Sequence, residues 1–66
     1  MFYLFEADST LVNLSEISSA QVMYHEADEE FTLNIHMKNG DIIRLYYNFQ
    51  DEADADLRAI YEKLAY

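Results

Sequence analysis

The chain has 66 residues, of which 52% are hydrophobic and 15% aromatic, so it can form a core but only that of one small domain. Thirteen acidic against four basic residues give a formal net charge of −9. This charge argues against direct binding to nucleic acid or to an anionic membrane, because both depend on Lys and Arg. The absence of cysteine excludes disulfides, thiol nucleophiles and cysteine-ligated zinc. We therefore expect a single compact domain over residues 1–66 that binds neither nucleic acid nor a membrane.

The N-terminal half contains short strand candidates separated by polar segments. Residues 2–5 are apolar, but they lack a basic flank and are followed by Glu6 and Asp8, which favours a strand over a signal peptide. Residues 10–14 form a weaker strand candidate, and residues 15–19 a polar turn with Ile17 as its inward anchor. Residues 21–25 form a further short strand, joined to the next strand through the acidic connector 26–30. The pairing of these strands remains open.

The clearest local pattern is a strict alternation of apolar and polar residues over positions 31–38, which predicts a half-buried strand. Asn39-Gly40 follows, a strong hairpin signal, and residues 41–49 then form a second strand. A two-residue loop would place Arg44 in the core. A three-residue loop over residues 38–40, with Gly40 left-handed in a bulge, pairs Met37 with Asp41 instead.

The burial of apolar side chains decides between the two registers, because a slip of one residue exchanges the faces of a strand. The three-residue loop places Phe31, Leu33 and Ile35 on one face with the odd-numbered residues 43–49 of the second strand. We predict this bulged hairpin. The opposite face then carries Thr32, Asn34 and His36 beside Ile42, Arg44 and Tyr46.

The last segment, residues 51–66, has the periodicity of an amphipathic helix. Asp51 suits the N-cap, and Glu52, Asp54 and Lys63 complement the helix dipole. The apolar stripe consists of Ala53, Leu57, Ile60, Tyr61 and Leu64. Covering one face of the sheet with this stripe gives an α+β fold, a small antiparallel meander of three to five strands packed against one C-terminal helix.

Residues that could carry catalysis are scarce. The only histidines, His25 and His36, lie on predicted strands, and no serine has the context of a nucleophile. Two histidines are too few for a zinc site, and residues 51–56 lack the glycine and loop of an EF-hand. The connector 26–30 could hold a weak Ca²⁺, although adjacent carboxylates without glycine rarely form a preorganised site. We expect no enzymatic activity, no metal site and no cofactor.

The negative charge is concentrated in the first half of the chain. Residues 1–30 contain seven acids and no base, a sum of −7, whereas residues 31–66 contain six acids and four bases, a sum of −2. Carboxylates spaced like DNA phosphates can occupy the basic groove of a nucleic-acid enzyme. The alternative is that the acidity serves solubility alone.

Six tyrosines and four phenylalanines exceed what one small core needs, so some of them are available as interface anchors. Together with the N-terminal acids they define the predicted partner-binding set, which is Glu6, Asp8, Glu16, Tyr24, Glu26, Asp28, Glu29, Glu30 and Tyr46. The competing interpretation is a structural or regulatory homodimer that buries Tyr46 and a sheet edge, with its acidity needed only for solubility.

In size, acidity, mixed strand and helix content and lack of catalytic groups, the chain resembles small inhibitors encoded by bacteriophages. This class includes DNA-mimicking inhibitors of uracil-DNA glycosylase and some anti-CRISPR proteins. Ser15-Glu16-Ile17 is similar, in a different order, to the Glu-Ser-Ile strand edge of one inhibitor family. The resemblance implies a phage protein, located in the cytoplasm of a bacterial host, that inhibits a uracil-DNA glycosylase or a nuclease through its basic groove.

Overall fold

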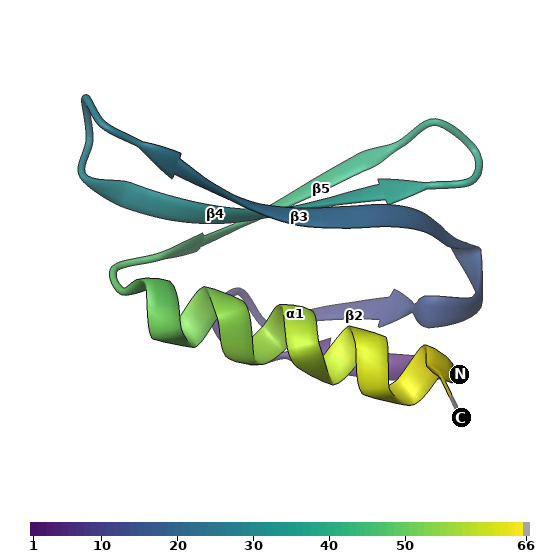
Figure 1. Ribbon diagram of the computed structural model, residues 1–66. Helices are drawn as coiled ribbons and strands as arrows, with labels where there is room; N and C mark the ends of the chain where they lie inside the picture. Colours follow the sequence, from purple (N-terminus) through teal and green to yellow (C-terminus); the bar gives the residue numbers. More distant parts are fainter. Residues whose placement is uncertain (66) are drawn as a thin grey trace.

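The computed structural model describes residues 1–65, and Tyr66, the last residue of the predicted helix, lies outside them. Two antiparallel sheets and one C-terminal helix confirm the predicted α+β fold. The three-stranded sheet forms one layer, and the helix and the two-stranded hairpin lie side by side beneath it (Figure 1). The elements in chain order are β1 (Phe2–Phe5), β2 (Thr10–Asn13), the 3-10 turn η1 (Leu14–Glu16), β3 (Ile17–His25), β4 (Glu30–Met37), β5 (Ile42–Tyr47) and α1 (Gln50–Ala65).

The β4–β5 hairpin has the predicted register and bulged loop. Leu33 pairs with Leu45 and Ile35 with Ile43, so these side chains share the core face. The Gly40 N–H donates to the Met37 carbonyl at 3.0 Å, and Gly40 has a φ of +97°, which glycine adopts without steric cost. The prediction was wrong for Phe49, which is exposed, because β5 ends at Tyr47 and the chain leaves the sheet to begin the helix.

Strand β3 is longer than predicted because it begins at Ile17. Only Ser15 and Glu16 of the predicted polar turn lie in η1, where the Asn13 side chain accepts a hydrogen bond of 3.2 Å from the Ser15 N–H. The residues that follow pair with the end of β4 through a register shift between Ile17 and Ser19. Pairing with a neighbouring strand therefore overrides the polar composition of this segment. Ile17 packs against the core, as predicted.

Helix α1 begins one residue earlier than predicted, so Asp51 lies in its first turn and not at the N-cap. Ala53 and Ile60 are buried, whereas Tyr61 and Leu64 of the predicted stripe are exposed, Tyr61 to 70%. The side of α1 that packs on the three-stranded sheet is rotated from the predicted stripe toward Asp56. Asp56, outside the predicted stripe, contacts β5 on that side.

The core joins both layers. Phe5 and Val12 of the β1–β2 hairpin point into it and meet Leu33 and Leu45 of the sheet and Ile60 of the helix. Full burial of side chains of this size contributes about 1.5–3 kcal/mol each. An isolated two-stranded hairpin is marginal in water, so these inward residues hold β1 and β2 in place.

Candidate functional site: an acidic end and its cleft

The turns of the β1–β2 and β3–β4 hairpins have almost the same sequence and conformation. Residues 6–9 read Glu-Ala-Asp-Ser and residues 26–29 read Glu-Ala-Asp-Glu. In each turn the fourth residue is left-handed, with φ of 50° at Ser9 and 52° at Glu29. Its N–H donates to the carbonyl of the first residue, Glu6 or Glu26, at 3.4 Å. One local pattern therefore builds two turns that each present acidic side chains.

A third Glu-Ala-Asp segment, residues 52–54, lies near the start of α1. Strands β1, β3 and β5 all run toward the same end of the molecule, so the two acidic turns and the helix start gather there, in the left-hand half of Figure 1. We call this region the acidic end. Carboxylates at a helix N-terminus are favoured by the helix dipole, which makes the third segment locally stable.

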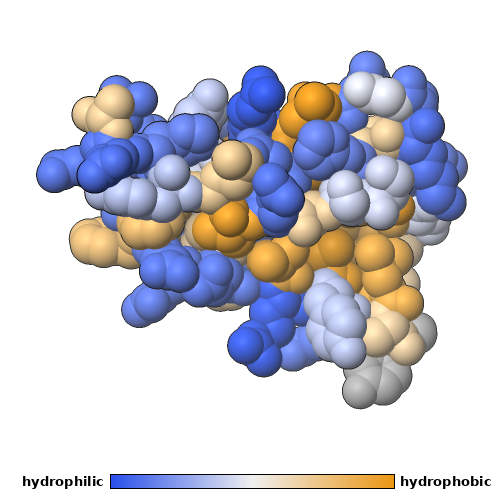
Figure 2. Space-filling view, turned by 45° about the horizontal axis from the view of Figure 1, so that its top comes forward, coloured by the Kyte–Doolittle hydropathy of each residue, from blue (hydrophilic) through white to orange (hydrophobic). Residues whose placement is uncertain are grey.

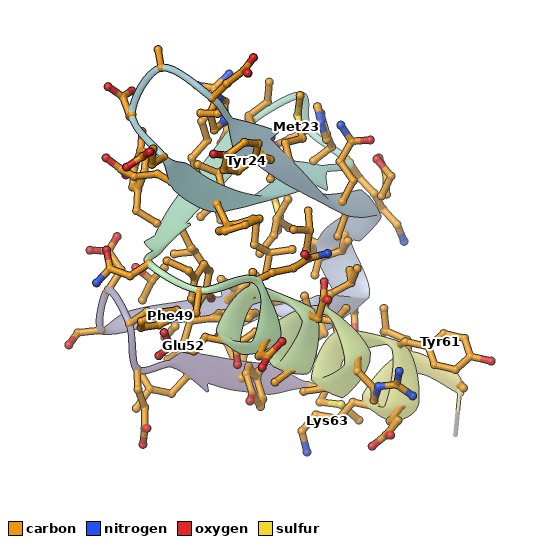
Figure 3. All side chains as sticks on the ribbon, turned by 60° about the vertical axis from the view of Figure 1, so that its left-hand side comes forward. Met23, Tyr24, Phe49, Glu52, Tyr61 and Lys63 are labelled. Carbon is orange, nitrogen blue, oxygen red and sulfur yellow. The ribbon has the colours of Figure 1, made fainter. Side chains whose placement is uncertain are left out.

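A cleft of about 710 Å³ opens at the acidic end, between the β1–β2 turn and the first half of α1. Tyr47 lies in its wall, and the Tyr47 hydroxyl donates a hydrogen bond of 2.5 Å to Asp56 Oδ2. The cleft separates the hairpin from the helix start, where Glu52 projects from α1 (Figure 3). The complete lining is Tyr3, Leu4, Glu6, Ala7, Tyr47, Glu52 and Asp56.

The two tyrosines of the cleft are held in their neutral form. Burial, followed by the hydrogen bond and the charge of Asp56, raises the pKa of Tyr47 well above its ordinary value of 10.0. Burial, and then the charges of Asp56 and Glu6, also raise the pKa of Tyr3. The cleft therefore combines neutral phenols with three carboxylates, a lining that suits a cationic group.

The sequence-predicted partner residues are divided between different parts of the molecule. Glu16 lies in η1, away from the acidic end. Tyr24 pairs with Phe31 on the core face of the sheet, whereas Tyr46 pairs with Thr32 on the opposite face, so one flat surface cannot contact both tyrosines. The remaining predicted residues lie at the acidic end, and they are Glu6, Asp8, Glu26, Asp28, Glu29 and Glu30.

Each of these tyrosines borders acids of the β3–β4 turn. Tyr24 shares a hollow with Glu29 on the core side of the sheet. Tyr46 lines a hollow of about 370 Å³ on the outer face, together with Asp28, Glu30 and Arg44. Arg44 makes the outer hollow less negative than the cleft, and the cleft is the more acidic of the two.

Sequence reasoning missed the cleft residues Glu52, Asp56, Tyr3 and Tyr47. The acids of α1 were explained by helix capping, and Tyr47 was expected only to fill the core. The sequence did contain one signal for them, the recurrence of Glu-Ala-Asp at residues 6–8, 26–28 and 52–54. It shows that the start of the helix repeats the acidic motif of the two turns.

Within residues 1–65, no three His, Asp or Glu side chains are arranged to hold a metal ion. None of the helical residues in this range forms a segment long and apolar enough to cross a lipid bilayer. No protein-family model, curated protein or solved structure matches the chain. The functional argument therefore depends on the acidic end itself.

Proposed function

We propose that this protein is a non-enzymatic binding module whose acidic end occupies the basic nucleic-acid groove of a partner enzyme and inhibits that enzyme by mimicking DNA. The gathering of the three Glu-Ala-Asp segments at one end supports this proposal most directly. Residues 6–9, 26–30 and 51–56 hold ten of the thirteen acids and no Lys or Arg.

Placing so many carboxylates together costs stability, because like charges repel. Duplex DNA carries about one negative charge per 1.7 Å of its axis, and a groove that binds it is lined with Lys and Arg. The acidic end projects from two hairpin turns and a helix start, so its carboxylates are spread over a surface and fixed by the backbone. Such a surface can replace phosphates without paying for the ordering of a flexible tail.

The cleft adds to this charged surface a shaped site for a single cationic side chain. A Lys or Arg side chain of the partner that enters it meets Glu6, Glu52 and Asp56, with the ring of Tyr3 beside them. Aromatic rings attract cations, and Tyr provides contact area at low entropic cost. In the proposed complex, the cleft fixes the orientation of the partner.

The proposal is tested by comparing two variants with equal charge. In the acidic-end variant, Glu6→Gln, Glu26→Gln and Asp28→Asn are combined. In the control variant, Glu16→Gln, Asp41→Asn and Glu62→Gln remove the three acids that lie outside the acidic segments. Each immobilised protein is incubated with bacterial lysate at low salt and then washed with duplex DNA or with high salt.

We expect the parent and the control variant to retain a nucleic-acid enzyme that DNA and salt both release, and the acidic-end variant to lose it. The captured enzyme should also be inhibited on its own nucleic-acid substrate by the parent protein. Equal retention by the two variants would contradict the role of the acidic end. The capture of no protein that DNA displaces would contradict the proposal as a whole.

A further inference from the structure

The two sides of α1 have different surroundings. On one side lies the β1–β2 hairpin, where the Lys63 ammonium lies 5.7 Å from the centre of the Tyr3 ring. On the other side Leu57, Tyr61 and Leu64 follow one another at helical spacing, and both Tyr61 and Leu64 are exposed. Tyr61 points away from the rest of the molecule in Figure 3. We call these three residues the helix stripe.

Strand β3 forms one edge of the three-stranded sheet, because the strand order is β3-β4-β5. Its nine residues include no Asp, Glu, Lys, Arg or Pro. Natural edge strands are commonly protected by charged residues, especially Lys, or by Pro, and β3 has only the register shift at its first residues. The opposite edge strand, β5, carries Arg44 in its centre.

The β3 edge and the helix stripe lie next to each other. Val22 of β3 and Leu57 of α1 are only partly buried and pack against the same core. Gln50, on the stripe side of the helix start, lines a hollow together with Val22 and Tyr24. Hydrophobic side chains gather in a band across the face seen in Figure 2. The hairpin covers the core on one side, and on this side, which we call the open side, the core is bounded by the partly buried Val22 and Leu57.

We propose that a second copy of this chain covers the open side, with β3 pairing antiparallel to β3 of the partner copy and the two helix stripes packing together. An antiparallel pair of identical strands is compatible with the two-fold symmetry of most homodimers. The resulting sheet is continuous across both copies, and the apolar residues of the two helix stripes are buried against each other.

The lack of acidic and basic residues in β3 and the mixed charges beside the helix stripe favour a second copy as the occupant. Two molecules of net charge −9 repel each other, but β3 itself contributes no acidic side chain to a contact between them. Asp54 and Arg58 line a hollow with Leu57 and Tyr61, so charges of both signs flank the stripe. Antiparallel pairing of β3 places the acidic ends of the two copies at opposite ends of the paired strands.

The test is the oligomeric state, measured by analytical ultracentrifugation over a range of protein and salt concentrations. We expect a dimer that persists at high salt, because salt screens the repulsion between the copies. Gln21→Glu should give a monomer, since Gln21 is at the centre of β3 and its two copies would lie opposite each other. Tyr61→Glu should also give a monomer, because it places a charge in the helix stripe.

Two controls add the same charge elsewhere. Asn48→Asp matches Gln21→Glu but follows β5, and Tyr46→Glu matches Tyr61→Glu but lies on the outer face of the sheet. Both control proteins should remain dimers, and circular dichroism should show that all four variants are folded. A monomeric parent protein would overturn the proposal, and so would a dimer that is lost in Tyr46→Glu but retained in Tyr61→Glu. Neither result depends on whether the acidic end binds a partner enzyme.

Discussion

The Tyr47 hydroxyl and the Asp56 carboxylate form a 2.5 Å hydrogen bond that connects the last strand to the helix across only nine residues of sequence. Tyr47 is 6% exposed, so this bond lies at the boundary between core and cleft. Hydrogen bonds to charged groups contribute about 1.5–3 kcal/mol. We predict that Tyr47→Phe lowers the free energy of unfolding by an amount in this range, measured by urea denaturation. An unchanged denaturation midpoint would show that the bond does not stabilise the fold.

The raised pKa of Tyr47 predicts a loss of stability in alkali. In the unfolded chain Tyr47 ionises near its ordinary pKa of 10.0, whereas in the folded protein it remains protonated to higher pH. Its contribution is therefore complete below pH 10 and declines as the pH rises above that value. The unfolding free energy of the parent should fall more steeply between pH 9 and pH 11 than that of Tyr47→Phe. Parallel pH profiles would contradict this assignment.

The left-handed residues of the two acidic turns predict a stabilising substitution. The left-handed conformation destabilises a residue with a Cβ by about 1–2 kcal/mol, and substitution by glycine removes part of this cost. Ser9→Gly should therefore raise the unfolding free energy by up to about 1 kcal/mol, measured by thermal denaturation. The control is Ser18→Gly in β3, where glycine should destabilise an extended strand. If both variants are destabilised equally, Ser9 is not strained.

The outer face of the sheet contains two buried polar residues with different hydrogen bonding. Thr32 Oγ1 is hydrogen-bonded to His25 Nε2 at 2.8 Å, whereas Asn34 donates only to the weak acceptor Met23 Sδ, and its Oδ1 is buried without a partner among the described residues. Removing an unsatisfied buried polar group can be neutral or stabilising, but removing a satisfied one costs about 0.5–1.5 kcal/mol. Asn34→Leu should therefore unfold at the parent's temperature or above it, and Thr32→Val below it. The reverse order in calorimetry would contradict this comparison.

The β4–β5 hairpin could be predicted in detail because its information is local. Alternation at residues 31–38 fixes the faces, and Gly40 provides the conformation that the loop needs. The pairing of β1 with β2 could not be predicted, because strands of four residues give little alternation to read. Their position under the sheet depends on Phe5 and Val12 entering a core that other elements complete.

The side of α1 that faces the protein was predicted only in part. The candidate site was also predicted only in part, because some of its residues lie on that helix. Periodicity correctly places Ala53 and Ile60 inside, but it cannot reveal that Tyr47 of β5 forms a hydrogen bond to Asp56 and holds it inward. The acids of the turns were recognised from composition. Their proximity to Glu52 follows from three strands running the same way, which is a property of topology and not of any one segment.

The separation of charge along the molecule also makes the protein an electric dipole. Its longest dimension is 33 Å, with the acidic end on one side, while toward the other Lys38 and Lys63 are balanced by Asp41 and Glu62 in the β4–β5 loop and the last turn of α1. In the field of a basic surface such a molecule rotates before it makes contact, so that productive collisions become more frequent than random ones. This torque acts over a Debye length, about 10 Å at 0.1 M salt. Adding salt should therefore slow association with a basic partner before it weakens the finished complex.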